Sequence, residues 1–436
     1  MIEIESRLSE LQAVGLDRRT RLVSGPQGPH VVLDGRPVLM LCSNNYLGLA
    51  DHPRVREAAA DAARRWGVGS GASRLVSGTM TIHRRLEERL AEFKGRESAL
   101  LFGSGFLANM GVIAALARPG DVIFSDELNH ASIIDGCRLS RADVFVYDHG
   151  DMEHLRWGIA QAEGRGALIV TDGVFSMDGD VAPLAELAEL AERTRVRLMV
   201  DEAHGTGTLG PGGRGAVAEA GVEDQVDVIV GTLGKALGSY GAFVACDSVM
   251  ARYLVNAART FIFSTAPPPP AVAGAMAALE LLETRPELVT RLQSNAATLR
   301  HELAREGLPI ESRTHILPLV VGQAGAAVQA AEMALQDGVY AQAIRPPTVP
   351  PMSSRLRLAV MASHRTEELR RAARVLVRAA REAGPVPEEH DDLEFEYELD
   401  YQEPEPYFHE PNFAADERVV AGAELFDFEA DQRLAA

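Results

Sequence analysis

Two stretches of the sequence place reactive side chains directly after buried apolar runs. VRLMVDEAH (196–204) ends in Asp201 and His204, and VDVIVGTLGKALG (226–238) carries Lys235 in a glycine-rich turn. Desolvation in such a turn favours the neutral, nucleophilic form of a lysine and suits it to a Schiff base. An isolated Gly-Lys pair is more often a surface loop. Its combination with an aspartate and a histidine at strand ends favours a catalytic lysine instead.

These residue types match the needs of pyridoxal phosphate. The cofactor requires an amine for its aldehyde, an acid for its pyridine nitrogen, a flat group over its ring and an anion cradle. Lys235 supplies the amine, and Asp201 is suited to keep the ring nitrogen protonated. His130, in DELNHAS, is the candidate ring-stacking group. The sequence therefore predicts a pyridoxal-phosphate site.

The remaining cofactor contacts are predicted from loops at other strand ends. The segment Ser104-Gly105-Phe106 opens a helix after an apolar strand, and its free N–H groups and positive helix end suit a phosphate. Hydroxyl and imidazole groups for the phosphate or the ring oxygen come from Ser176, His204, Thr232, and Ser264 or Thr265. Each of these residues alone has a simpler structural explanation. The prediction rests on their occurrence together.

The elements that must position these groups alternate between strands and helices. Apolar runs predict buried strands at 97–102, 121–126, 142–148, 166–173, 196–204 and 226–234. Amphipathic stretches lie between them, which is typical of an α/β domain with a largely parallel sheet. Ligands of such sheets gather at the carboxyl ends of the strands, where the candidate residues occur.

The chain divides into four predicted parts. An N-terminal arm (1–50) contains a short helix and a β-hairpin with its turn at Asp34-Gly35. It is followed by a large cofactor-binding domain (51–284), a smaller α+β domain (285–383) with strands LPLVVG and SRLRLAV, and an acidic tail (384–436). We expect the tail to be disordered, with a short helix in its last ten residues.

Composition limits the partners. Of the net charge of −19, the segment after Gly384 contributes −15, so the body of the chain is nearly neutral. Nucleic acid is not an expected partner, because it requires a basic face. Three distant cysteines with no metal-ligand spacing predict no metal site. With no secretory signal and no run of about 18 apolar residues, we expect a cytoplasmic protein without a membrane span.

The sequence resembles the α-oxoamine synthase family of fold-type-I pyridoxal-phosphate enzymes. The matching stretches follow one another from about residue 40 to 365 and include SNNYLGL, GSGASRLVSGT, LFGSGFLAN, TDGVFSMDGDVAPL, VDEAHGTGTLGPGGRG, GTLGKALGSYGA and RPPTVPPMSSRLRL. Within the family, AIRPPTVP (343–350) is most similar to the biotin-pathway branch. The resemblance implies an aspartate aminotransferase-like fold and a homodimer with shared active sites.

The resemblance also implies roles for individual residues. Lys235 would carry the cofactor, Asp201 would contact the pyridine nitrogen and His130 would stack on the ring, with Gly105, Phe106, Ser176, His204, Thr232 and Thr265 completing the cofactor site. The substrates would contact Arg18, Asn45, His130, Thr348 and Arg357, with Arg357 taking the amino-acid carboxylate. The implied reaction is decarboxylative condensation of L-alanine with a pimeloyl thioester.

Alternatives within the family stay open at this point. Glycine or serine with another acyl-CoA defines the 2-amino-3-ketobutyrate CoA ligase, 5-aminolevulinate synthase and serine palmitoyltransferase types. His315 is a departure that resembles the glycine-using relatives. The acyl carrier is either coenzyme A or an acyl carrier protein. The tail, which has no counterpart in the family, is either a solvated extension or a docking peptide. A non-catalytic partner subunit is the remote alternative.

Overall fold

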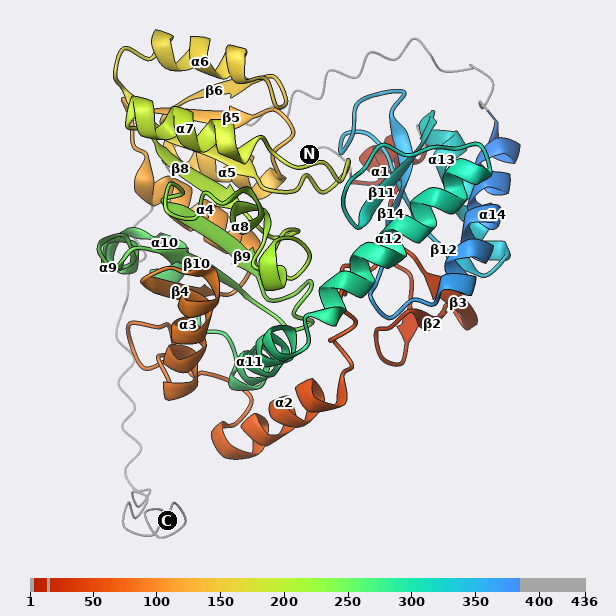
Figure 1. The fold of residues 1–436 in the computed structure, drawn as a ribbon, viewed down its shortest axis with the longest axis horizontal. Coiled ribbons are helices and arrows are strands. Elements are labelled where there is room, and N and C mark those ends of the chain that lie inside the picture. Colours follow the sequence, from red (N-terminus) through yellow and green to blue (C-terminus); the bar gives the residue numbers. More distant parts are fainter. Residues whose placement is uncertain (1–3, 14–15, 385–436) are drawn as a thin grey trace. The chain divides into compact units, whose positions relative to one another are not determined.

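The computed structural model describes residues 4–13 and 16–384. By internal contacts the chain divides into Met1–Val386 and Pro387–Ala436. The acidic tail and the helix expected in it lie outside the described residues. Within the first unit, a larger region is built on a seven-stranded sheet and a smaller region on two short sheets (Figure 1).

The larger sheet contains every strand predicted for it. Its order is β4 (Ser98–Phe102), β10 (Ala242–Cys246), β9 (Val228–Thr232), β8 (Arg197–Asp201), β7 (Gly166–Asp172), β5 (Val122–Asp126) and β6 (Asp143–Tyr147). From β9 to β6 the neighbours are parallel, as expected. β10, which was not predicted, pairs antiparallel with both β4 and β9.

One expectation about this sheet is wrong. The run 142–148 was predicted to be a buried strand, but Val144 and Val146 are exposed. The reason is that β6 lies at the edge of the sheet and pairs only with β5. An apolar run alone does not distinguish an edge strand from a central one.

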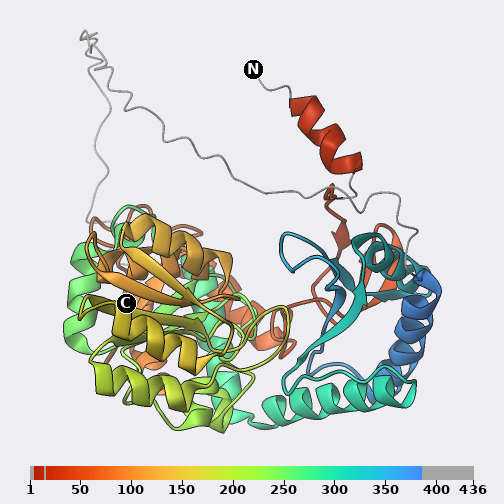
Figure 2. The ribbon, with the colours of Figure 1, turned by 90° about the horizontal axis from the view of Figure 1, so that it is seen from above.

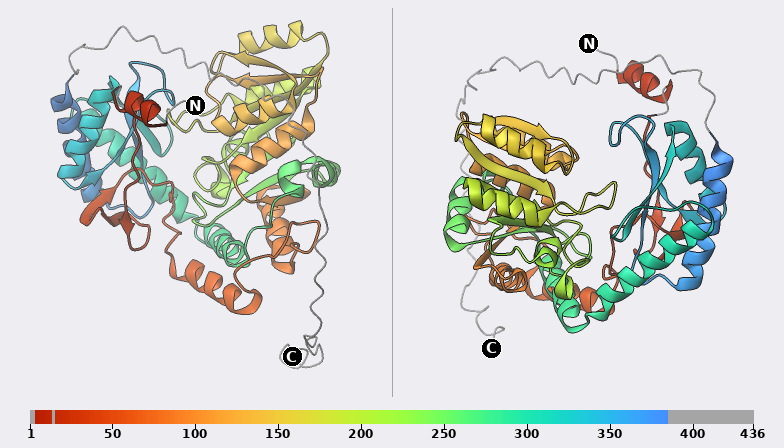
Figure 3. Two further views of the ribbon diagram at one scale, coloured as in Figure 1. Left: turned by 180° about the vertical axis from the view of Figure 1, so that it is seen from behind. Right: turned by 45° about the horizontal axis from the view of Figure 1, so that its top comes forward.

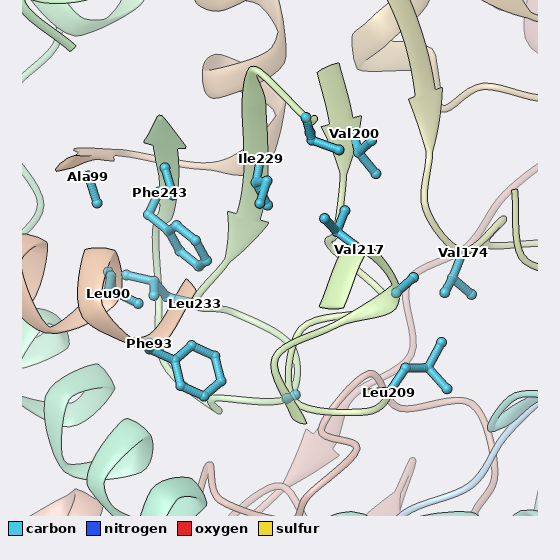
Figure 4. Close-up of a cluster of buried hydrophobic side chains, with 14 of the residues drawn as sticks. Leu90, Phe93, Ala99, Val174, Val200, Leu209, Val217, Ile229, Leu233 and Phe243 are labelled. Carbon is cyan, nitrogen blue, oxygen red and sulfur yellow. The ribbon is translucent and has the colours of Figure 1, made fainter. Parts of the chain in front are cut away.

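Helices cover both faces of the larger sheet because its central strands are apolar on both faces. The cluster on one face includes residues of α4 (Gly105–Leu116), α5 (Ala131–Ser140), α9 (Ser248–Ala257) and α10 (Arg259–Ile262). The cluster on the other face draws on α2 (Pro53–Trp66), α3 (Thr81–Lys94), α6 (Met152–Gln161), α7 (Leu184–Thr194), α8 (Ala216–Ala220) and α11 (Pro269–Thr284). Figure 4 shows part of this second core, where Leu90 and Phe93 of α3 lie beside Phe243.

The smaller region joins both ends of the described chain. The hairpin β2 (His30–Leu33) and β3 (Arg36–Met40) confirms the predicted turn, and it lies between β1 (Val23–Ser24) and β12 (Val339–Tyr340). A second sheet has the order β11 (Ile316–Gly322), β14 (Ser354–Ala359) and β13 (Gln342–Ile344).

Three helices complete the smaller region (Figure 2): α12 (Glu287–Arg305), α13 (Ala324–Gln336) and α14 (Thr366–Ala383). Their apolar faces share one core with Leu39 of the hairpin and with Leu41, which follows it. The N-terminal helix α1 (Ile4–Ala13) buries none of its described side chains. A short 3-10 turn, η1, spans Pro211–Gly213. Within the described residues, no helix is long and apolar enough to cross a membrane.

Candidate active site

Asp201 ends β8 and is held by amide donors. The Nδ2 atom of Asn109, in α4, donates to its Oδ2 at 2.6 Å, and the backbone N–H of Ala203 donates to its Oδ1 at 2.8 Å. Asn109 also donates to the hydroxyl of Ser132 at 2.9 Å. Because both donors fix the orientation of the carboxylate, Asp201 presents a preorganised acidic group at the carboxyl end of the sheet.

Lys235 lies in the turn after β9 and reaches across to the turn after β8. Its Nζ is 2.8 Å from Nε2 of His204, and Nδ1 of His204 is 2.6 Å from the hydroxyl of Tyr46. Since the Tyr46 hydroxyl donates to Oδ1 of Asn44 at 2.9 Å, it accepts from Nδ1–H of His204, which leaves Nε2 to accept from the lysine. A connected network thus joins the lysine to residues of the SNNYLGL segment.

Burial shifts the protonation equilibria of this network. It lowers the pKa of Lys235 to about 8, against the opposing effect of the Asp201 carboxylate. It also holds the pKa of His204 well below 6.5, and the positive charge of Lys235 adds to that effect. His204 is therefore a neutral imidazole at neutral pH. Lys235 has an accessible neutral form, as a Schiff-base lysine requires.

A second carboxylate, Asp172, lies directly opposite Asp201. The two residues are register partners at the ends of the parallel strands β7 and β8. Burial, followed by the neighbouring Asp201 charge, raises the pKa of Asp172 well above 3.8. Its Oδ2 accepts from the backbone N–H of His130 at 2.8 Å. Sequence reasoning missed Asp172, although it too ends a predicted strand.

His130 caps α5 and leaves its ring exposed beside the site. Its Nδ1 accepts from the N–H of Ser132 at 3.2 Å, and the ring of Phe106 lies edge-on with centroids 6.4 Å apart. Partial burial of its own ring lowers the pKa of His130, while the Asp201 charge opposes that shift. A neutral, flat ring held at one nitrogen is suited to stacking on an aromatic cofactor.

Arg357, in β14, approaches the network from the smaller region. Its Nε donates to the carbonyl of Ser176, Nη1 to Asn44 at 3.3 Å and Nη2 to the hydroxyl of Tyr46 at 3.4 Å. The side chain is buried, and among the described residues no carboxylate lies within 4.0 Å of its guanidinium. Arg355, two residues earlier, is paired with Asp178. A buried guanidinium held by neutral oxygens is prepared for a carboxylate ligand.

The start of α4 offers an anion cradle. Ser104 caps the helix by accepting from the N–H of Leu107 at 3.2 Å. A Cβ added at Gly105 would meet nothing within 4 Å, so the helix end faces open space. Together with Lys235, Asp201 and His130, this arrangement fits pyridoxal phosphate, with the phosphate at the helix end. The hydroxyl of Thr232 donates to the carbonyl of Gly241 at 3.1 Å and so shapes the turn that carries Lys235.

The structure does not gather every predicted residue here. Thr265 is exposed and forms an isolated bridge with Ser73. Arg18 and Thr348 line a separate cavity of about 730 Å³ between the N-terminal segment and the smaller region. The Asn45 amide is committed to backbone groups of Gln27 and Ala50. Its neighbour Asn44, which was not predicted, contacts Arg357 instead.

His315 is a further residue whose position the sequence did not predict. It is fully buried, and its ring packs edge-on against Tyr46 with centroids 4.0 Å apart. Burial and the Arg357 charge lower its pKa to about 3. Within the described chain neither ring nitrogen has a hydrogen-bond partner. A neutral imidazole with two unused nitrogens therefore lies beside the Tyr46 network.

Comparisons with known proteins agree with this geometry. The family model for class I and II aminotransferases matches residues 36–376. The 8-amino-7-oxononanoate synthase of Citrifermentans bemidjiense is 52% identical over 383 residues, which cover 87% of this chain and 98% of the relative. That of Geobacter sulfurreducens is 52% identical over 388 residues, covering 88% and 99%.

Solved structures that superpose on this chain are enzymes of the same kind. Serine palmitoyltransferase of Sphingomonas wittichii superposes with a TM-score of 0.83 at 32% identity, covering 88% of this chain and 98% of that one. A serine palmitoyltransferase of S. paucimobilis, solved with bound PLP and myriocin, has the same score and coverage at 30% identity. The 8-amino-7-oxononanoate synthase of Francisella tularensis scores 0.69 at 28% identity, covering 79% and 98%.

The chain therefore belongs to the class I and II aminotransferase family, with the fold-type-I architecture and pyridoxal phosphate as cofactor. Within that family it is a PLP-dependent acyltransferase of the α-oxoamine synthase group, and it is most similar to 8-amino-7-oxononanoate synthases.

Proposed function

We propose that this enzyme condenses L-alanine with a pimeloyl thioester in biotin biosynthesis, releasing CO2 and a free thiol and forming 8-amino-7-oxononanoate. The observation that carries the proposal is the 52% identity to synthases of that name over 98% of their length. The structural likeness to serine palmitoyltransferases, at 30–32% identity, supports the shared reaction type.

In the proposed mechanism, Lys235 both anchors the cofactor and moves the substrate proton. Pyridoxal phosphate supplies an electron sink for the amino-acid Cα when it is bound. Displaced by the incoming amino acid, the Lys235 amine would take the Cα proton, and its lowered pKa of about 8 favours that role. Asp201 would keep the proton on the pyridine nitrogen, oriented by Asn109. His130 would hold the ring plane.

Arg357 would bind and orient the amino-acid carboxylate until it leaves as CO2. Its buried guanidinium without a carboxylate partner in the described chain supports this assignment. We assign Arg18 and Thr348, which line the 730 Å³ cavity, to the acyl substrate. Asn45 and Thr265 stay predictions, since the Asn45 side-chain amide bonds backbone groups and Thr265 forms a backbone bridge with Ser73.

Thiol release tests the substrate assignment. The purified, cofactor-loaded protein should release thiol from pimeloyl-CoA when L-alanine is present and much more slowly with glycine. Alanine and glycine differ by one methyl group, which gives a selectivity of roughly 10- to 200-fold. Release with a pimeloyl carrier protein but not with pimeloyl-CoA would identify the carrier. Release only with glycine or serine and another acyl-CoA would contradict the assignment and place the enzyme in a sister branch.

We further propose that two copies pair and share their active sites. Large apolar side chains near Thr265 and the start of α4 are exposed, among them Leu75, Val76 and Phe263. Exposed apolar groups of this size are typical of interaction surfaces. Light scattering of the full chain at micromolar concentration should give twice the chain mass, and a monomer mass would contradict the proposal.

A further inference from the structure

The loop between β7 and α7 connects the larger region to the substrate side of the site. This 174–181 loop is closed at its base by a bridge between Val174 and Val181 and by the N–H of Phe175 donating to the carbonyl of Asp180 at 3.0 Å. The N–H of Gly179 donates back to the Phe175 carbonyl at 2.9 Å. The loop is thus an ordered hairpin that reaches toward the smaller region (Figure 3).

The tip of the 174–181 loop is bonded to the smaller region. The carbonyl of Gly179 accepts from the hydroxyl of Thr314 at 2.8 Å and from that of Ser312 at 3.2 Å. A Cβ at Gly179 would lie 2.2 Å from the carbonyl of Ile316, so the two backbones are in close contact. The tip has little freedom to shift against β11.

Two arginines of β14 meet the same tip. Asp178 pairs with Arg355, and the carbonyl of Ser176 accepts from Nε of Arg357. Among the described residues, three groups hold the Arg357 guanidinium, and this carbonyl is the one that the 174–181 loop supplies. The position of the loop therefore helps to fix the orientation of the Arg357 guanidinium, to which we assign the substrate carboxylate.

At its base the 174–181 loop is tied to the sheet by His149, which follows β6. Nδ1 of His149 is 2.9 Å from Oδ1 of Asp126, and Nε2 is 2.9 Å from Oδ2 of Asp180. The ring also packs edge-on against Phe175, with centroids 4.4 Å apart. Asp126 ends β5 and is fixed by the backbone N–H groups of Leu128 and Gly150.

A histidine between two carboxylates must donate from both nitrogens, which makes it an imidazolium. The side-chain hydrogen bonds to Asp126 and Asp180 accordingly raise the pKa of His149 to about 10, although burial opposes them. This pair of ion contacts is intact at neutral pH. His149, Asp126 and Asp180 are not among the residues to which we assign contacts with the cofactor or the substrates.

We propose that His149 is a positioning residue for Arg357, acting through Asp180 and the 174–181 loop to set the binding of the amino-acid carboxylate. The inference rests on the proposed role of Arg357. It predicts that His149 affects the affinity for the amino acid and leaves cofactor binding and the acyl substrate unaffected.

Steady-state kinetics of the cofactor-loaded His149→Gln variant test this. We expect the KM for L-alanine to rise about 10-fold, while kcat and the KM for the acyl thioester change by less than about 3-fold. The absorbance of the bound cofactor should stay at its wild-type position. An unchanged KM for alanine, or a parallel loss of kcat and cofactor content, would overturn the proposal. A wild-type enzyme that is inactive with alanine would instead contradict the proposed function.

His154→Gln is the matched control. His154 is likewise paired with an aspartate, Asp148, and packs edge-on against a phenylalanine, Phe145, at 5.0 Å. It does not contact the 174–181 loop through any described hydrogen bond. We expect its alanine KM to stay within about 2-fold of wild type. A rise equal to that of His149→Gln would mean that any disturbance of this area has the same effect.

Two further variants separate positioning from general stability. Asp180→Asn keeps the shape of the carboxylate and removes its charge, so it should reproduce the KM effect, and combining it with His149→Gln should add little. In an Arg357→Gln background, whose own alanine KM should be higher still, His149→Gln should change the KM no further. Additive effects in these cycles would show that His149 acts independently of Arg357 and would overturn the proposal.

The pH dependence of stability gives an independent readout. Because folding raises the pKa of His149 above its unfolded value of about 6.5, its stabilising effect is complete below that value and is lost as the pH rises through about 10. The difference in melting temperature between wild type and His149→Gln should therefore be largest near pH 6 and shrink toward pH 10. A constant difference would mean that the imidazolium contacts do not hold the loop.

Discussion

Replacing Lys235 with alanine should lower kcat by at least about 10³-fold, because the variant loses both the amine that anchors the cofactor and the base proposed for the Cα proton. The absorbance of the linked cofactor should disappear as well. The substitution should not lower the melting temperature of the cofactor-free protein, since burial already disfavours the charged form of this lysine and lowers its pKa to about 8.

The composition of the chain makes this experiment unusually clear. The whole sequence has two lysines, Lys94 and Lys235. Borohydride reduction of the cofactor-loaded wild type, followed by peptide mapping, should place the cofactor on Lys235. Lys94 serves as the internal control, because it is buried with Glu202 and donates to the carbonyl of Arg214. Labelling of Lys94, or full turnover by Lys235→Ala, would contradict the assignment.

The site residues that could be predicted from the sequence are those that the parallel sheet itself brings together. Asp201 ends β8 and Lys235 follows β9, and parallel pairing brings the carboxyl ends of the two strands to one edge of the sheet. Nothing else is required to place these two groups close together. The same rule should have identified Asp172 at the end of β7, but its carboxylate has no separate signature in the sequence.

The other groups that were missed make contacts between segments that are far apart in the sequence. Tyr46 reaches His204 across 158 residues of sequence, and Asn109 reaches Asp201 across 92. Contacts of this separation depend on how whole elements pack. In the irregular 43–48 segment no repeat indicates which side chain faces inward, so Asn44 and Asn45 could not be distinguished. Similarly, β10 follows a turn of glycines, and its short apolar run carries no alternation to mark it.

Replacing Asp201 with asparagine is expected to have the second largest effect, lowering kcat about 10²- to 10³-fold with cofactor still bound. A neutral amide cannot hold the proton on the pyridine nitrogen, so the ring would lose most of its power to withdraw electrons from the substrate Cα. Both present partners, Nδ2 of Asn109 and the N–H of Ala203, are donors and would face an amide in place of a carboxylate. Single-turnover measurement of Cα-proton exchange with solvent would place the loss in the proton-transfer step.

Asp172→Asn is the matched control for this prediction, because Asp172 is the register partner of Asp201 on the adjacent strand and is equally buried. Burial, and after it the Asp201 charge, holds the pKa of Asp172 well above the usual range. Its carboxyl group is therefore protonated up to a higher pH than that of an ordinary aspartate. Its described bond is to the backbone N–H of His130. We therefore expect Asp172→Asn to reduce kcat by less than about 10-fold, through a small shift of the stacking histidine. Equal losses in the two variants would mean that the pair shares the proton and that the pyridine nitrogen has no single acidic partner.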